Sequence, residues 1–67
     1  MPYILIQITK ENVSTEQKQQ LIQEATDLVV RVLDKDPATT FVVIDEIETY
    51  NWGVAGESVS AIRNRQR

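Results

Sequence analysis

The chain has 67 residues, a net charge of -3 and a pI near 4.7, and it contains neither cysteine nor histidine. An acidic balance argues against nucleic acid as a partner, because phosphate binding depends on a dense basic surface. The missing residue types exclude disulfides, thiol nucleophiles, serine-histidine triads and ordinary zinc sites. A chain this short forms a single domain over residues 1–67 with a thin core, so we expect self-association to supply the remaining stability.

The apolar segments are too short for a membrane protein. None approaches the roughly 20 residues that a membrane span requires, and the N-terminus does not combine a basic stretch, an apolar stretch and a cleavage site. We therefore expect no membrane partner and a cytoplasmic location.

Residues 3–9 are predicted to form the first strand. Their sequence, YILIQIT, is rich in β-branched side chains and places three isoleucines on one face. The other face carries Tyr3 and Leu5, so it is partly apolar as well. A strand covered on both sides shows this pattern, and we expect a helix to cover one face and a second subunit the other.

A long helix is predicted from about Thr15 to Leu33. Ser14 stands three residues before Gln17, which is the capping-box pattern of a helix start. Pro37 and the polar residues before it end the helix, since the residue that precedes a proline is displaced from helical geometry. The helix has a single apolar stripe, which consists of Leu21, Ile22, Ala25, Leu28, Val29, Val32 and Leu33.

Residues 41–47, with the sequence FVVIDEI, are predicted to form a second strand. A strand, a long helix and another strand in this order make a βαβ unit with parallel strands. Strand alternation directs Asp45 and Glu46 to opposite faces, so these two carboxylates do not form an obvious acid-base pair.

The chain becomes irregular after Glu48. Gly53 and Gly56 favour a short hairpin that displays Trp52. Three arginines, Arg63, Arg65 and Arg67, follow at the end of the chain. They form either a frayed, solvated terminus or a basic patch that could hold an anion.

Pro2 is an unusual candidate for catalysis. Proline is small enough at the cleavage point for removal of Met1 to be expected, which would leave a free secondary amine at the start of the first strand. An α-amino group has a pKa of about 7.7–8.0 in model peptides, and burial against apolar surface lowers it. A neutral amine can act as a general base or attack a carbonyl as a nucleophile. The ordinary alternative is that Pro2 merely begins a strand.

The chain resembles the 4-oxalocrotonate tautomerase family over almost its whole length. The resemblance rests on segments in the family's order and near its spacing: Met1-Pro2, the first strand, residues 14–18 (STEQK), residues 36–40 (DPATT), the strand 42–46 and residues 52–57 (WGVAGE). It implies an α+β fold, namely a single βαβ unit with a C-terminal hairpin, whose four-stranded sheet is completed by dimerisation. Three such dimers make a homohexamer.

The resemblance also implies a cofactor-independent isomerase. Pro2 would be the general base for keto-enol or 1,3-allylic proton transfer in a small unsaturated 2-hydroxy or 2-oxo acid such as 2-hydroxymuconate, and neither a metal nor an organic cofactor would be needed. Trp52 takes the place of an apolar pocket wall, which would exclude water and keep Pro2 uncharged. Interface packing is the alternative role of Trp52.

The chain departs from the family at the arginines that bind substrate. Members that act on dicarboxylates carry one arginine just before the helix and another in the second strand, whereas residues 11–13 (ENV) and Phe41 or Val42 stand there in this chain. A buried carboxylate without a cationic partner is costly. Lys10 and Arg63 are the candidate replacements, and a plain surface charge is the alternative for each.

Two other functions remain open from the sequence. A dehalogenase or hydratase would use the same amine for a different reaction, as other branches of the superfamily do. A non-catalytic oligomeric binding module would keep the fold without turnover, in keeping with the missing arginines.

Overall fold

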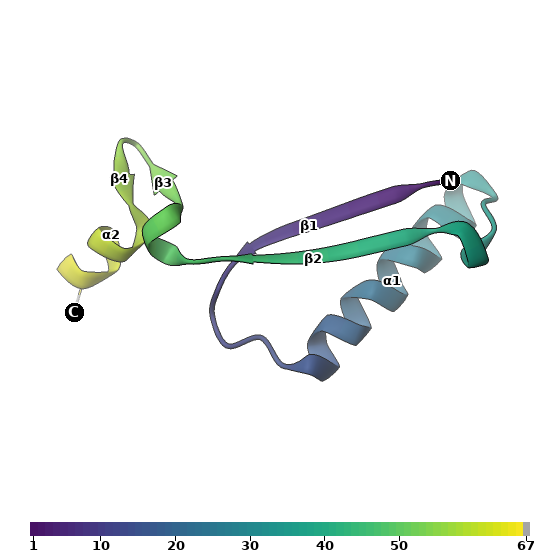
Figure 1. Cartoon of the computed structure of the whole chain (residues 1–67), viewed down its shortest axis with the longest axis horizontal. Coiled ribbons are helices and arrows are strands. Elements are labelled where there is room, and N and C mark those ends of the chain that lie inside the picture. The colour runs from purple at the N-terminus through teal and green to yellow at the C-terminus, as the bar shows by residue number, and fades with distance from the viewer. Residues whose placement is uncertain (67) are drawn as a thin grey trace.

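The computed structural model describes residues 1–66, which begin with a βαβ unit. Strand β1 (Tyr3–Thr9), helix α1 (Thr15–Leu33) and strand β2 (Phe41–Ile47) follow one another along the chain. The two strands are parallel, with Tyr3 opposite Phe41 and Thr9 opposite Ile47. Helix α1 lies on one side of them (Figure 1). The predicted bounds of all three elements are confirmed.

Local side-chain chemistry sets both ends of α1. The Ser14 side chain accepts a hydrogen bond of 3.1 Å from the Gln17 amide, and the Gln17 side chain accepts one of 2.9 Å from the Ser14 amide. These two bonds are the predicted capping box. At the other end Asp34 adopts a left-handed conformation with φ of 55°, which commonly ends a helix. Asp36 is extended before the short turn η1 (Pro37–Thr39), as expected next to a proline.

The C-terminal part of the chain forms a second, smaller group of elements. Turn η2 (Thr49–Asn51) leads into an antiparallel hairpin of β3 (Gly53–Val54) and β4 (Glu57–Ser58), and helix α2 (Val59–Arg65) follows. Figure 1 shows this group at the far end of the sheet from the N-terminus. The predicted hairpin is confirmed.

Helix α2 corrects the expectation of a frayed terminus. Ser58 caps this helix, because its side chain accepts a hydrogen bond of 3.2 Å from the Ala61 amide. Arg63 and Arg65 lie in its last turn, and each forms an ion pair with a glutamate outside the helix. Arg67 lies outside the described residues. A helix of seven residues is too short to show a clear apolar period in the sequence.

Side chains in residues 1–66 are at most half-buried when the chain is considered alone. The strand face under α1 contains the half-buried Ile4, Ile6 and Ile44. The opposite face is open, and its large apolar side chains are between 42% and 62% exposed: Tyr3, Leu5, Phe41 and Val43. On α1, half of the predicted apolar stripe is half-buried, whereas Leu28, Val32 and Leu33 are exposed.

The shape of the chain agrees with this lack of a closed core. Its radius of gyration is 15.4 Å, whereas a compact domain of this length would have about 11 Å. The apolar strand face and the uncovered part of the α1 stripe are surfaces that association could bury. Within residues 1–66 the helices are too short or too polar to cross a membrane.

Candidate active site

Pro2 lies at the start of β1, at the end of the sheet where α1 finishes (Figure 1). Its carbonyl oxygen accepts a hydrogen bond of 2.9 Å from the Phe41 amide, which ties this residue to the first residue of β2. Pro2 is half-buried, while the adjoining Met1 is 84% exposed. The nitrogen of Pro2, joined here to Met1, is therefore held at a defined place on the sheet.

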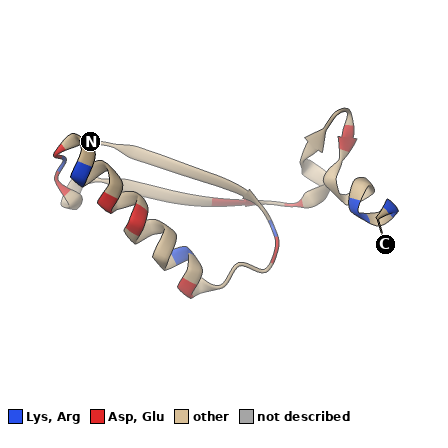
Figure 2. Cartoon of the chain, turned by 180° about the vertical axis from the view of Figure 1, so that it is seen from behind, with Lys and Arg blue, Asp and Glu red and all other residues tan. Residues whose placement is uncertain are grey.

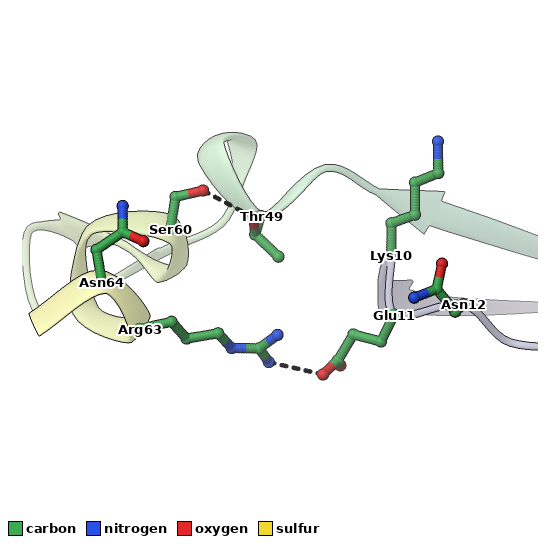
Figure 3. Close-up of a pocket in the computed structure, with 7 residues that line it drawn as sticks. All are labelled: Lys10, Glu11, Asn12, Thr49, Ser60, Arg63 and Asn64. Carbon is green, nitrogen blue, oxygen red and sulfur yellow. Dashed lines mark hydrogen bonds and ion pairs between the residues drawn. The ribbon is translucent and has the colours of Figure 1, made fainter. Parts of the chain in front are cut away.

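A polar cavity lies at the other end of β1 (Figure 3). It is formed by the loop after β1, by η2 and by α2, and its volume of about 400 Å³ is in the range of small-molecule sites. The structure thus brings together two of the sequence-predicted site residues, Lys10 and Arg63. The full lining consists of Lys10, Glu11, Asn12, Thr49, Ser60, Arg63 and Asn64.

Both predicted cations are paired with carboxylates. Lys10 Nζ lies 3.1 Å from Glu48 Oε1, and the hydrogen bond between them raises the pKa of Lys10. Arg63 Nη2 lies 2.8 Å from Glu11 Oε1 (Figure 3). The Thr9 hydroxyl donates to the other oxygen of Glu11, and this bond, with the nearby Arg63, lowers the pKa of Glu11. Exposed pairs of this kind stabilise a fold only slightly, so either cation can exchange its partner at small cost.

Neutral polar groups complete the cavity. The hydroxyls of Thr49 and Ser60 lie 2.7 Å apart and link η2 to α2, and the side-chain amides of Asn12 and Asn64 lie nearby in the lining. Such groups can hydrogen-bond the hydroxyl or keto oxygen of a small acid. Within the described part of the chain, no cluster of three or more histidine, cysteine, aspartate or glutamate side chains is placed to hold a metal ion.

Trp52 lies beside the cavity but is not part of its lining. It is half-buried between η2 and β3, and its carbonyl oxygen accepts a hydrogen bond of 2.8 Å from the Val59 amide at the start of α2. This bond fixes the hairpin against the helix. The tryptophan is thus positioned on a rigid corner of the C-terminal part.

Pro2 is far from the other predicted site residues within one chain. Strand β1 has seven residues, and at about 3.3 Å per residue it separates Pro2 from Lys10 by on the order of 20 Å. Trp52 and Arg63 lie beyond the C-terminal end of β2, also away from Pro2. A single chain therefore does not gather the four predicted residues into one site.

The carboxylates at the end of β2 point to opposite faces, as predicted. Asp45 Oδ2 accepts a hydrogen bond of 3.2 Å from Gln7 Nε2 on the open face. Glu46 forms an ion pair with Lys18 of α1 on the covered face. Neither carboxylate lies in the cavity lining.

The sequence did not identify Glu11 as the partner of Arg63. The two residues are separated by 52 positions, and their contact depends on α2, a helix that the apolar pattern does not predict. The nearest sequence signal is the opposite charge of Glu11 and the arginine-rich end of the chain.

Curated relatives cover nearly the whole chain. The tautomerase family model, described as "Tautomerase enzyme", matches residues 2–62. The chain is 55% identical over 65 residues to the probable tautomerase K2 of Dickeya dadantii, with 97% of each protein covered. It is 39% identical over 62 residues to the 2-hydroxymuconate tautomerase of Stutzerimonas stutzeri, which covers 92% of this chain and 97% of the relative.

Solved structures show the same fold. The crystal structure of DmpI from Helicobacter pylori is 46% identical, has a TM-score of 0.86 and covers 94% of this chain and 97% of that one. A heterohexamer 4-oxalocrotonate tautomerase from Chloroflexus aurantiacus is 28% identical, with a TM-score of 0.83 and coverage of 94% and 100%, so oligomers occur among the relatives. The predicted βαβ fold with its C-terminal hairpin is confirmed, and the chain belongs to the tautomerase family, with 4-oxalocrotonate tautomerase-like structure.

Proposed function

We propose that this chain is a cofactor-independent tautomerase in which the amine of Pro2, freed by removal of Met1, is the general base. It would move a proton in a keto-enol or 1,3-allylic transfer within a small unsaturated 2-hydroxy or 2-oxo acid. The observation that carries this proposal is the position of Pro2. Its residue is half-buried at the start of β1, and its carbonyl is bound to Phe41.

The setting of Pro2 favours an uncharged amine. Residues 2–9 and 41–44, the first parts of both strands, contain no lysine, arginine, aspartate or glutamate, and Figure 2 shows these strand segments free of charged residues. Apolar surroundings disfavour the charged form of an amine and lower its pKa from the usual value of about 7.7–8.0. The amine would then accept a proton near neutral pH.

The separation of Pro2 from the cavity supports a site built by two subunits. The β1-β2 sheet has only two strands within residues 1–66, so each strand has an outer edge open to pairing. Two-fold symmetry pairs identical strand edges antiparallel. The start of β1 then lies beside the end of the same strand in the partner, which brings Pro2 toward Lys10 of the partner subunit. A four-stranded dimer of this kind is the unit of the homohexamer that we propose, a trimer of dimers.

The roles of the other residues follow from this arrangement. Lys10 and Arg63 of one subunit would bind the substrate carboxylate, and Trp52 would exclude water from Pro2 of its neighbour. A 2-hydroxymuconate-like substrate is supported by the activity for which the Stutzerimonas stutzeri relative is named. Dehalogenase or hydratase chemistry and a non-catalytic binding module are the alternatives, and a cytoplasmic location stays a prediction.

The test compares two forms of the same chain. Protein that begins at Pro2, verified by mass spectrometry, is assayed for ketonisation of 2-hydroxymuconate or phenylenolpyruvate beside protein that retains Met1. We expect turnover only in the first, because the nitrogen of a Met1-Pro2 peptide bond is not basic. Equal rates in the two forms would contradict the role of Pro2. An oligomer that turns over neither compound in either form would favour the binding module.

A further inference from the structure

The contact between Glu11 and Arg63 suggests how the cavity selects its ligand. We propose that the Glu11 carboxylate is an internal competitor, which holds Arg63 until the carboxylate of an anionic enol or keto acid displaces it. The substrate class is therefore an acid whose carboxylate lies away from the reacting carbon. This inference rests on the proposed function, because it places the substrate of Pro2 in this cavity.

The geometry of the pair is that of a contact that can be exchanged. A guanidinium offers five donors and binds a carboxylate most strongly through two parallel bonds. Here one nitrogen, Arg63 Nη2, meets one oxygen, Glu11 Oε1, at 2.8 Å. The second oxygen of Glu11 is engaged by the Thr9 hydroxyl. Glu11 thus binds Arg63 at one point, and a free carboxylate in the cavity can bind the same arginine at two.

Exposure also favours exchange. The side chains of Arg63 and Glu11 are each 48% exposed, and exposed single-contact pairs have small net free energies. Glu11 remains attached to its loop, so it can turn outward to water without unfolding any element. An uncharged carbonyl compound cannot replace a carboxylate on Arg63, whereas an acid can.

The charges of the cavity support an anionic ligand. Its lining contains two cations, Lys10 and Arg63, and one carboxylate, Glu11. Departure of Glu11 leaves Arg63 and the neutral hydroxyl and amide groups facing the ligand (Figure 3). The low pKa of Glu11 keeps this competitor ionised at neutral pH. Glu11 therefore filters ligands by charge rather than by size.

A second pair on the same helix gives a matched control. Arg65 Nη1 forms an ion pair with Glu57 Oε2, with side chains 60% and 47% exposed, and neither residue lines the cavity. The substitutions Glu11→Gln and Glu57→Gln therefore remove the same charge from similar exposed pairs. Only the first frees an arginine of the cavity.

The experiment measures steady-state kinetics with 2-hydroxymuconate and calorimetric binding of cis,cis-muconate, a dicarboxylate of the same length that lacks the enol. For Glu11→Gln we expect about a threefold to tenfold lower KM and muconate Kd with kcat unchanged, as release of an exposed ion pair predicts. Glu57→Gln should match the unmodified protein within about twofold. Glu11→Asp, which keeps the charge but shortens the reach, should fall between the two. Arg63→Gln should weaken muconate binding and abolish the gain from Glu11→Gln.

Equal muconate affinity in the Glu11→Gln variant and the unmodified protein, including no measurable binding in either, would overturn the inference. The binding measurement does not depend on turnover. If Pro2 proved dispensable but Glu11→Gln still tightened muconate binding, the proposed function would fail while the role of Glu11 stood. If turnover required Pro2 but Glu11→Gln changed neither KM nor Kd, the reverse would hold.

Discussion

The carbonyl oxygen of Pro2 accepts a 2.9 Å hydrogen bond from the amide of Phe41, so the residue is bound to the sheet through its backbone and not through its ring. Alanine at position 2 keeps this carbonyl and therefore the strand pairing. We expect Pro2→Ala to leave the fold unchanged and to lower kcat/KM by about 10²–10⁴-fold, the usual contribution of a general base. Circular dichroism and the ketonisation assay, each on protein freed of Met1, check the two halves of this expectation. A rate equal to that of the unmodified protein would remove Pro2 from the mechanism.

Trp52 is predicted to set the pH range of activity. If its ring keeps water from Pro2 in the assembled protein, Trp52→Ala exposes the amine and its pKa rises toward about 7.7–8.0. A base works only when it is deprotonated, so the acid limb of the kcat/KM profile should move to higher pH. Tyr50→Ala is the control, because Tyr50 is an exposed aromatic residue in the neighbouring turn η2. Superimposable profiles for Trp52→Ala and the unmodified protein would leave Trp52 with a packing role alone.

The ion pair between Lys18 and Glu46 is predicted to stabilise the packing of α1 on β2. The two side chains are 34% and 22% exposed, so removal of one partner leaves a partly buried charge without its counterion. We expect Lys18→Met to lower the free energy of unfolding by about 1–2 kcal/mol. Lys10→Met breaks a more exposed pair, 57% and 41%, and should cost less than about 0.5 kcal/mol. Denaturant unfolding at one fixed protein concentration compares them, and equal costs would contradict the difference in burial.

Glu11 is predicted to make stability depend on pH in the acidic range. Its pKa in the folded chain lies below the usual value of 4.5, so the ionised form stabilises the fold. This stabilisation is present above pH 4.5 and is lost as the pH falls through the lower folded pKa. The difference in Tm between the unmodified protein and Glu11→Gln should therefore shrink as the pH is lowered from 6 toward 3. Arg63→Gln removes only one of the two causes and should give a smaller effect; a difference that stays constant with pH would argue against this linkage.

The sequence by itself determined the βαβ unit, because each of its elements is specified by local chemistry. Alternation of side chains fixes which residues of a strand share a face, and the Ser14 capping box fixes where α1 begins. The bounds of β1, α1 and β2 could be predicted for this reason. Pro2 could also be singled out, since its position next to Met1 is a property of the sequence alone.

The tertiary structure decided the surroundings of these residues. Arg63 meets Glu11 across 52 positions only because η2, the hairpin and α2 return the chain toward the end of β1, and a short capped helix leaves little periodic signal in a sequence. The length of the strands also places Pro2 at one end of the molecule and the cavity at the other. Local patterns specify elements, but a distance between two ends of a sheet depends on how the elements are joined and paired. That is the physical reason why the sequence could name Pro2, Lys10, Trp52 and Arg63, while only the structure could separate the first from the rest.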